Sequence, residues 1–387
     1  MQQYNYIIAG AGASGLSLAW KMLHSQLSEK KILIIDQSLT PTNDKTWCFW
    51  DAADPPFADL IYRKWTEAEV SIFGNRSIEP LSDYTYYCLR SGDFRNHILN
   101  SLKDHPSFDL LETPIQNFSF NGQNPILHTD KTSFNADFIF QSCFNPWDKA
   151  EDHPRHPLLQ HFLGWEVTTS KPVFNNNVFT LMDFDQTFGE GIAFIYLLPW
   201  SKTSALIEYT IFSDTLLEKK QYEEKVSLYL SNRFNLKPVD YNIERKEFGK
   251  IPMEDRPYKP WYKPRILNLG TVGGVTKPST GYTFKRIQKQ TDAIISSLLS
   301  KGTLQPQPPS KKRFKAYDLW LLQIIDQHPK DALRIFNHLF KNNSLDEVFR
   351  FLAEESSIFD DLKIMSSVPY LPFLRAIPKT FDRLREL

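Results

Sequence analysis

The N-terminal segment reads Tyr4-Asn5-Tyr6-Ile7-Ile8-Ala9-Gly10-Ala11-Gly12-Ala13-Ser14-Gly15. Its first half is a continuous apolar run, which is typical of a buried parallel β-strand. Its second half is a Gly-x-Gly-x-x-Gly turn, and apolar residues recur at helical spacing after it. A second apolar run, Lys31 to Asp36, ends on an acid. This order predicts a β-α-β unit of the dinucleotide-binding type.

Each glycine of the turn has a physical task in such a unit. Gly10 allows the tight turn, Gly12 lets the backbone approach a pyrophosphate, and Gly15 lets the helix pack closely on the sheet. The N-terminus of the helix attracts the phosphate charge, and an acid at the end of the second strand binds ribose hydroxyls. The residues expected to bind the dinucleotide from this part of the chain are Gly10, Gly12, Ala13, Ser14, Gly15 and Asp36.

A second glycine window lies far from the first in the sequence. Only 15 of the 387 residues are glycine, and seven of these fall in the two windows. NAD and FAD both use the first motif, so that motif alone leaves the choice open. The second window follows a strand-like run and has the shape of a loop that returns to the ribityl chain and ring of a flavin, which favours FAD. Its residues expected to bind FAD are Gly270, Gly273, Gly274, Thr280 and Gly281.

Charge and cysteine content exclude several classes of protein. Lys+Arg and Asp+Glu are both 45, so the chain lacks the basic footprint of a nucleic-acid binder. Three widely spaced cysteines predict neither a disulfide framework nor a metal site, and they fit a reducing cytoplasm. No signal peptide is expected, and no run approaches the ~18 apolar residues of a spanning helix. The oligomeric state cannot be read from the sequence.

The remaining pattern predicts an α/β protein with three parts. Residues 1–70 and 245–305 are expected to form a discontinuous FAD-binding domain. Residues 71–244 contain short β-branched and aromatic runs, which predict a mainly antiparallel sheet on the substrate side. Residues 306–387 follow a proline-rich linker and are expected to be helical, with possible membrane contact.

Several segments resemble, in the same order, motifs of the bacterial-type lycopene β-cyclase family. They are Thr46-Trp47-Cys48-Phe49, Leu206-Ile207-Glu208-Tyr209-Thr210, Phe248-Gly249-Lys250-Ile251-Pro252-Met253 and Gly273-Gly274 through Thr280-Gly281-Tyr282. The resemblance implies a Rossmann-like FAD domain of the flavin hydroxylase/glutathione reductase type, intertwined with an antiparallel-sheet substrate domain and followed by C-terminal helices. Flavin hydroxylases usually carry Gly-Asp where this chain has Gly270-Thr271, which argues against an oxygen-activating hydroxylase.

The resemblance also implies the chemistry. In this family an acid protonates an end group of lycopene, and ring closure gives β-carotene by way of γ-carotene without net redox change. Reduced FAD stabilises the carbocation, and NAD(P)H is the expected reductant. The substrate dissolves in membranes, so peripheral contact with the inner face of the membrane is expected. Residues 368–374 could lie at the membrane interface or pack as a bent tail on the core.

Glu208 is the first candidate for the acid. Period-2 alternation places it on one face of a strand with Leu206 and Phe212, and burial there would raise its pKa. A solvent-facing glutamate is the alternative from the residues alone, and the resemblance favours the buried acid. Asp183 is the second candidate. Aromatic residues expected to bind the polyene and exclude water are Trp47, Phe49, Trp50 and Phe184.

Two other functions stay open at this point. One is an FAD-dependent monooxygenase acting on a lipid, and the other is a carotenoid-binding flavoprotein without catalytic activity. The acid distinguishes the last of these, because a carrier has no need of Glu208. Sequence does not decide between cyclisation of one or both ends, or between β and ε rings.

Overall fold

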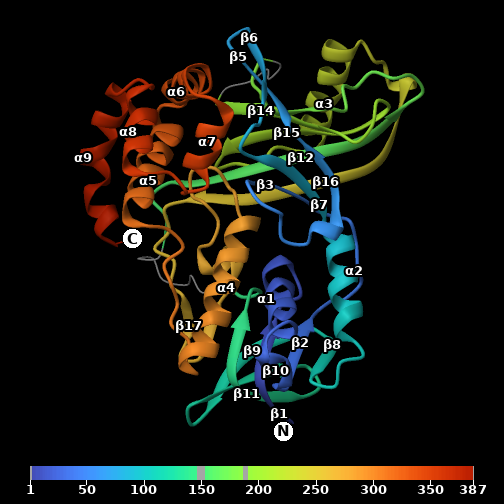
Figure 1. Cartoon of the computed structure of the whole chain (residues 1–387), viewed down its shortest axis with the longest axis vertical. Helices are drawn as coiled ribbons and strands as arrows, with labels where there is room; N and C mark the ends of the chain where they lie inside the picture. The colour runs from blue at the N-terminus through green and yellow to red at the C-terminus, as the bar shows by residue number, and fades with distance from the viewer. Residues whose placement is uncertain (1, 146–152, 186–190, 387) are drawn as a thin grey trace.

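The computed structural model describes residues 2–145, 153–185 and 191–386 (Figure 1). The described residues form three β-sheets and a set of helices that is densest at the C-terminal end of the chain. In Figure 1 the sheet around β1 lies at the lower end of the view, the large sheet lies above it, and the orange and red C-terminal helices stand beside the large sheet.

The first sheet is built around the predicted β-α-β unit. Its order is β17-β18-β11-β1-β2-β8, with β9 and β10 attached through β11, and β1 pairs in parallel with both β2 and β11. Its bounds are β1 (Gln2–Ala9), β2 (Ile32–Asp36), β8 (Phe108–Glu112), β9 (Ile115–Asn121), β10 (Asn124–Thr129), β11 (Ser133–Gln141), β17 (Trp261–Lys263) and β18 (Ile266–Asn268).

The central strands of this sheet are buried on both faces, which explains their continuous apolar runs. Alternate residues such as Ile8 and Ile34 face a core shared with α1 (Ala13–Leu23), α2 (Ser91–Leu102) and α4 (Phe284–Lys301). The intervening residues Ile7, Leu33 and Ile35 face a second core under the β9–β10 hairpin.

The second sheet has seven strands in the order β16-β12-β15-β14-β13-β5-β6. All of its pairs are antiparallel except β13 with β5. One face packs against α3 (Lys219–Phe234). Its bounds are β5 (Glu67–Ile72), β6 (Asn75–Pro80), β12 (Pro157–Thr169), β13 (Val178–Asp183), β14 (Ile192–Pro199), β15 (Ser204–Ser213) and β16 (Tyr241–Glu254).

The other face of the second sheet packs against a small sheet and the C-terminal helices, and together they form the largest apolar core. The small sheet has the order β3-β7-β4. Its strands are β3 (Thr46–Asp51), β4 (Ile61–Trp65) and β7 (Thr85–Arg90). The helices are α5 (Lys312–Gln327), α6 (Pro329–Asn342), α7 (Leu345–Leu352), α8 (Ile358–Ser366) and α9 (Leu371–Glu386).

The sheets differ from the domain boundaries expected from the sequence. Strands β8 to β11 belong to the first sheet, although they lie within residues 71–244, the range expected for the substrate domain. Conversely, β5 begins before residue 71, and β16 lies largely beyond residue 244, yet both belong to the second sheet. The difference arises because strands pair with partners distant in the chain, and composition carries little information about such pairing.

The packing of α1 on the glycine turn makes a prediction about stability. A Cβ at Gly15 would lie 1.9 Å from the Gly10 carbonyl oxygen, whereas a Cβ at Gly12 would meet nothing within 4 Å. Gly15→Ala should therefore lower the free energy of unfolding by about 1–3 kcal/mol, while Gly12→Ala should cost less than about 1 kcal/mol. Urea unfolding of both variants measures these two changes. Equal stability of the two variants would contradict a clash between a Cβ at residue 15 and the Gly10 carbonyl oxygen.

Candidate functional site

The glycine turn forms an open cradle at the start of α1. Gly10 has φ +109°, a conformation that favours glycine, and Gly12 is the N-cap residue of α1. No side chain among the described residues caps this helix, so its first N–H groups are free to bind an anion. The space beside Gly12 is empty of protein atoms. Ala13 and Ser14 form the first turn of the helix.

Asp36 lies at the same turn, as the spacing predicts. Its Oδ2 atom accepts a hydrogen bond from the Ala11 N–H at 2.6 Å. The guanidinium group of Arg95, on α2, approaches the same carboxylate at 3.7 Å, and the Nε atom of Arg95 is buried without a partner among the described residues. Arg95 is not among the residues expected from the sequence, because no local pattern connects it to the turn.

The second glycine window packs directly against the first. Gly270 has φ +58°, and a Cβ there would lie 2.8 Å from Ser14 Oγ. Gly273 lies in the same turn, Gly274 packs on Tyr258, and Gly281 packs on Gln160 of β12. The Oγ1 atom of Thr280 is buried without a partner among the described residues. Two segments more than 250 positions apart therefore lie in direct contact.

A buried ion pair fixes the loop of the second window. Lys277 is 4% exposed, and its Nζ atom contacts Asp318 of α5 at 2.8 Å and Glu354 at 3.2 Å. Ser279 Oγ donates to Asp318 at 2.6 Å. These contacts connect the loop to the C-terminal helices, and the sequence analysis missed them.

Glu208 lies in a row of residues across the second sheet. Tyr196 of β14, Glu208 of β15, Gly164 of β12 and Glu247 of β16 are direct neighbours in register, so their positions share one face. A Cβ at Gly164 would lie 2.6 Å from Glu208 Cγ, so the glycine makes room for the glutamate side chain. Leu206 and Phe212 lie on the same face and belong to the largest core.

Two acids of this row have different environments. Glu247 accepts hydrogen bonds from the Thr46 N–H and Oγ1, each at 2.7 Å, and it pairs with Arg245 at 2.8 Å. Burial raises the pKa of Glu208 well above its usual range, and the negative charge of Glu247 raises it further. Proximity to the Cys48 thiol acts in the same direction, and the cations Arg245 and Lys45 oppose it. The net effect favours the protonated form of Glu208.

Asp183 is not brought together with Glu208. It occupies the opposite face of the sheet, where Tyr229 of α3 donates to its Oδ2 atom at 3.4 Å and the Asp185 N–H donates to its Oδ1 atom at 3.1 Å. Burial raises the pKa of Asp183 to about 6. A register shift in β13, between Thr180 and Asp183, contributes to this placement.

The aromatic residues of β3 divide between two cores. Trp47 and Phe49 stack on Phe284 of α4, with ring centroids 5.5 and 5.0 Å apart. Trp50 points to the opposite side, where it stacks on Phe349 and meets Tyr282 edge-on. Only Trp50 therefore faces the core that contains the Glu208 row.

Phe184 belongs to the same core as Trp50, and it stacks on Phe336. Two tyrosines of this core, Tyr86 and Tyr196, were not expected from the sequence, and their hydroxyl groups are 2.8 Å apart. Both belong to strands with an alternating pattern, but only the register of β7 and β14 places them together.

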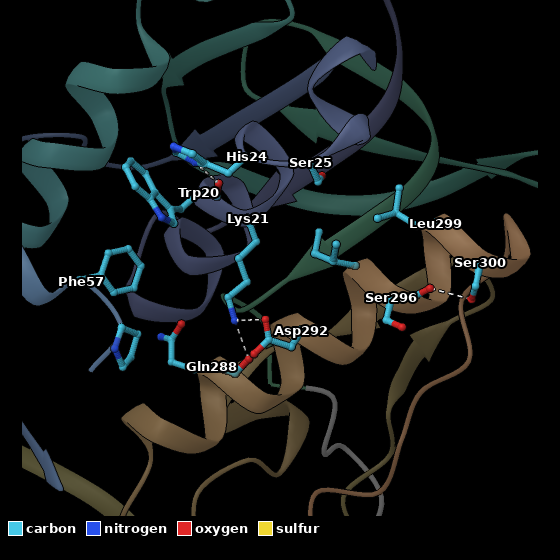
Figure 2. A pocket seen from close by; sticks show the side chains of 12 residues that line it. Trp20, Lys21, His24, Ser25, Phe57, Gln288, Asp292, Ser296, Leu299 and Ser300 are labelled. Carbon is cyan, nitrogen blue, oxygen red and sulfur yellow. Dashed lines mark hydrogen bonds and ion pairs between the residues drawn. The ribbon is translucent and has the colours of Figure 1, made fainter. Parts of the chain in front are cut away.

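Glu208 lines none of three pockets formed by the described residues. A pocket of about 720 Å³ lies between α1 and α4, where Lys21 contacts Asp292 at 2.6 Å (Figure 2). It contains none of the residues expected to form the site. A second pocket, of about 590 Å³, borders Gly273 and Gly274. A small cavity of about 40 Å³ is lined by Cys48, Trp50 and Tyr282, among others.

The fold and the two glycine windows define a protein of the flavin hydroxylase fold class, as the sequence predicts. A flavoprotein/dehydrogenase from Cytophaga hutchinsonii matches 98% of this chain and 99% of its own, with a TM-score of 0.61 and 12% sequence identity. At this identity the likeness concerns the fold.

The family follows from the sequence as a whole. The model of the lycopene cyclase protein family matches residues 5–377, so the chain belongs to that family, and the predicted resemblance is confirmed. A lycopene beta-cyclase from Pantoea ananas is 22% identical over 389 residues, covering 97% of both chains. A chloroplastic lycopene beta cyclase from Nicotiana tabacum is 24% identical over 341 residues, which are 82% of this chain and 65% of the tobacco protein.

Within residues 2–145, 153–185 and 191–386, no helix combines the length and the apolar character needed to span a membrane.

The raised pKa of Glu208 predicts how stability changes with pH. The unfolded chain loses this proton above about pH 4.3, whereas the folded chain keeps it to higher pH, so wild-type stability decreases over that interval. Glu208→Gln cannot ionise. The free energy of unfolding of Glu208→Gln minus that of wild type should therefore increase by about 1.4 kcal/mol per pH unit above about pH 4.3. The difference should level off once Glu208 ionises in the folded wild-type chain.

Urea unfolding between pH 4 and pH 8 measures this difference. Glu67→Gln, at an exposed position on β5, controls for the general effect of removing a glutamate. A Glu208→Gln difference that is the same at every pH would contradict a protonated Glu208 in the folded chain.

Proposed function

We propose that this chain is a lycopene β-cyclase that converts the ψ end groups of lycopene to β-ionone rings, giving β-carotene by way of γ-carotene. The observation that carries the proposal is the buried Glu208 carboxyl group, whose raised pKa lets it hold a proton in an apolar and aromatic core. Membership of the lycopene cyclase family supports the same substrate class.

The two glycine windows fit FAD. The open space at Gly12 and the uncapped N-terminus of α1 suit a pyrophosphate, and Asp36 is placed for ribose hydroxyls. The unpartnered Oγ1 atom of Thr280 offers a further polar contact at the second window. When bound and reduced, with NAD(P)H as the proposed reductant, FAD supplies electrostatic stabilisation of the carbocation.

The chain's own residues perform the proton transfers in this proposal. Glu208 donates its proton to the terminal double bond of the polyene, and the resulting tertiary cation closes onto the C5=C6 bond. The Glu208 carboxylate left by this transfer accepts a proton from the new ring, which gives the β-ionone product and restores the acid. Aromatic faces such as those of Trp50, Phe184 and Tyr196 stabilise the cation by about 0.5–2 kcal/mol each and exclude water that would trap it.

Asp183 has no part in these steps, because it faces α3 on the other side of the sheet. Trp47 and Phe49 act indirectly in this proposal: they pack on Phe284, the first residue of α4, and so hold β3 against that helix.

The test uses lycopene in liposomes, reduced FAD, deuterated water and no oxygen. We expect β-carotene that has gained a deuterium for each ring closed, measured by mass spectrometry. Glu208→Gln should lower the rate by about 10²-fold or more, while Glu67→Gln should leave it unchanged. An oxygenated product formed only with oxygen would favour the monooxygenase, and a polyene returned unchanged would favour the carrier.

We propose that α8 and α9 place the protein on the membrane in which the substrate dissolves. Their exposed side chains include Phe359 (84% exposed), Leu362 and Leu374. The cations Arg375 and Lys379 are exposed on α9 beside these apolar residues. Apolar side chains flanked by cations are typical of helices that lie at a bilayer interface with anionic lipids.

Cosedimentation with anionic liposomes tests this surface. The double variant Phe359→Ser, Leu374→Ser should bind at least tenfold more weakly, because two large apolar side chains no longer enter the interface. Val239→Ser, which changes an 88% exposed apolar residue in the turn before β16, should bind as wild type does. Equal binding by the double variant would exclude α8 and α9 as the contact.

A further inference from the structure

Two of the three cysteines face each other beside the Glu208 row. Cys48 of β3 and Cys88 of β7 are direct partners in the antiparallel register. Direct partners project to the same face, and both residues belong to the core that contains Trp50. Both thiols are free.

The backbone at this pair permits a disulfide bond. The Ser91 N–H donates to the Lys45 carbonyl oxygen at 3.0 Å, which makes Lys45 and Ser91 a hydrogen-bonded pair of the ladder. Hydrogen-bonded and non-hydrogen-bonded pairs alternate, so Cys48 and Cys88 form a non-hydrogen-bonded pair with a Cα–Cα separation of about 4.5 Å. Disulfides form at Cα–Cα separations of about 4.4–6.8 Å.

The pair is also placed to affect the acid. The Cys48 thiol is one of the groups that raise the pKa of Tyr196 and of Glu208. Cys48 is partly exposed and lines the small cavity with Trp50, whereas Cys88 is fully buried. A small reagent therefore reaches Cys48 first.

We propose that Cys48 and Cys88 form a reversible disulfide that inhibits the Glu208 site, with a small disulfide as the oxidant. The Cys48 sulfur, after losing its proton, attacks the small disulfide and releases one thiol. The Cys88 sulfur then displaces the second thiol from the mixed disulfide as it loses its own proton. Two protein thiols are oxidised to one disulfide, and one small disulfide is reduced to two thiols.

Oxidation would change the contacts of the acid. A sulfur–sulfur bond of about 2.0 Å draws the two sulfur atoms together, so the Cys48 sulfur loses its thiol proton and moves relative to Tyr196 and Glu208. The inhibitory effect rests on the proposed cyclase function, whereas formation of the bond does not.

The test oxidises the full chain, carrying Cys143→Ser to remove the exposed third thiol, with 4,4′-dithiodipyridine. We expect an intact mass 2 Da below that of the reduced chain, a cross-linked peptide containing Cys48 and Cys88, and recovery of both thiols with dithiothreitol. Adding Cys88→Ser should instead leave one pyridylthio adduct on Cys48. A stable adduct on Cys48 with Cys88 still reduced would overturn the proposal, as would two thiols that react only in denaturant.

Lycopene cyclisation before and after oxidation tests the inhibition. We expect oxidation to lower the rate of cyclisation at least fivefold, and dithiothreitol to restore it. The Cys88→Ser chain, after its adduct has been removed, should show no such loss. An unchanged rate in the fully cross-linked chain would overturn the inhibition. A reduced chain that does not cyclise lycopene at all would overturn the proposed function, and the disulfide would then be judged by the mass measurement alone.

Discussion

The arrangement of the chain depends on close packing at the two glycine windows, where α1 approaches the glycine turn and the second window approaches α1. Without a side chain at Gly15, α1 can lie against the Gly10 carbonyl, and without one at Gly270 the second window can lie against Ser14. These contacts join β1 to the segment between β18 and α4. The largest core, which lies between the second sheet and the C-terminal helices, adds the apolar burial that stabilises the rest.

Features determined by local pattern could be predicted from the sequence. The β-α-β unit follows from short-range periodicity, and the buried position of Glu208 follows from that periodicity together with the family resemblance. The face of Asp183 could not be predicted, because a register shift inside β13 breaks the alternation. The Glu208 row and the membership of β8 to β11 depend on pairing between distant strands, which no local pattern records.

The two glutamates around Gly164 lie in different environments on one sheet. Glu247 accepts hydrogen bonds from Thr46 and pairs with Arg245, and its negative charge favours the neutral form of its neighbour Glu208. A buried environment that raises the pKa of an acid is a recurring feature of proton donors. Arg245 also pairs with Glu166 at 2.9 Å, so Glu247 belongs to a network anchored in the sheet.

The buried ion pair of Lys277 has a consequence for how this chain can change in evolution. Removing α5 would leave the Lys277 ammonium group without Asp318, its partner at 2.8 Å, and breaking a buried pair in this way costs about 3–5 kcal/mol. A shortened descendant would have to replace the lysine and the helix together. The second glycine window and the helical tail therefore depend on each other for stability, although the tail shares no sequence motif with the window.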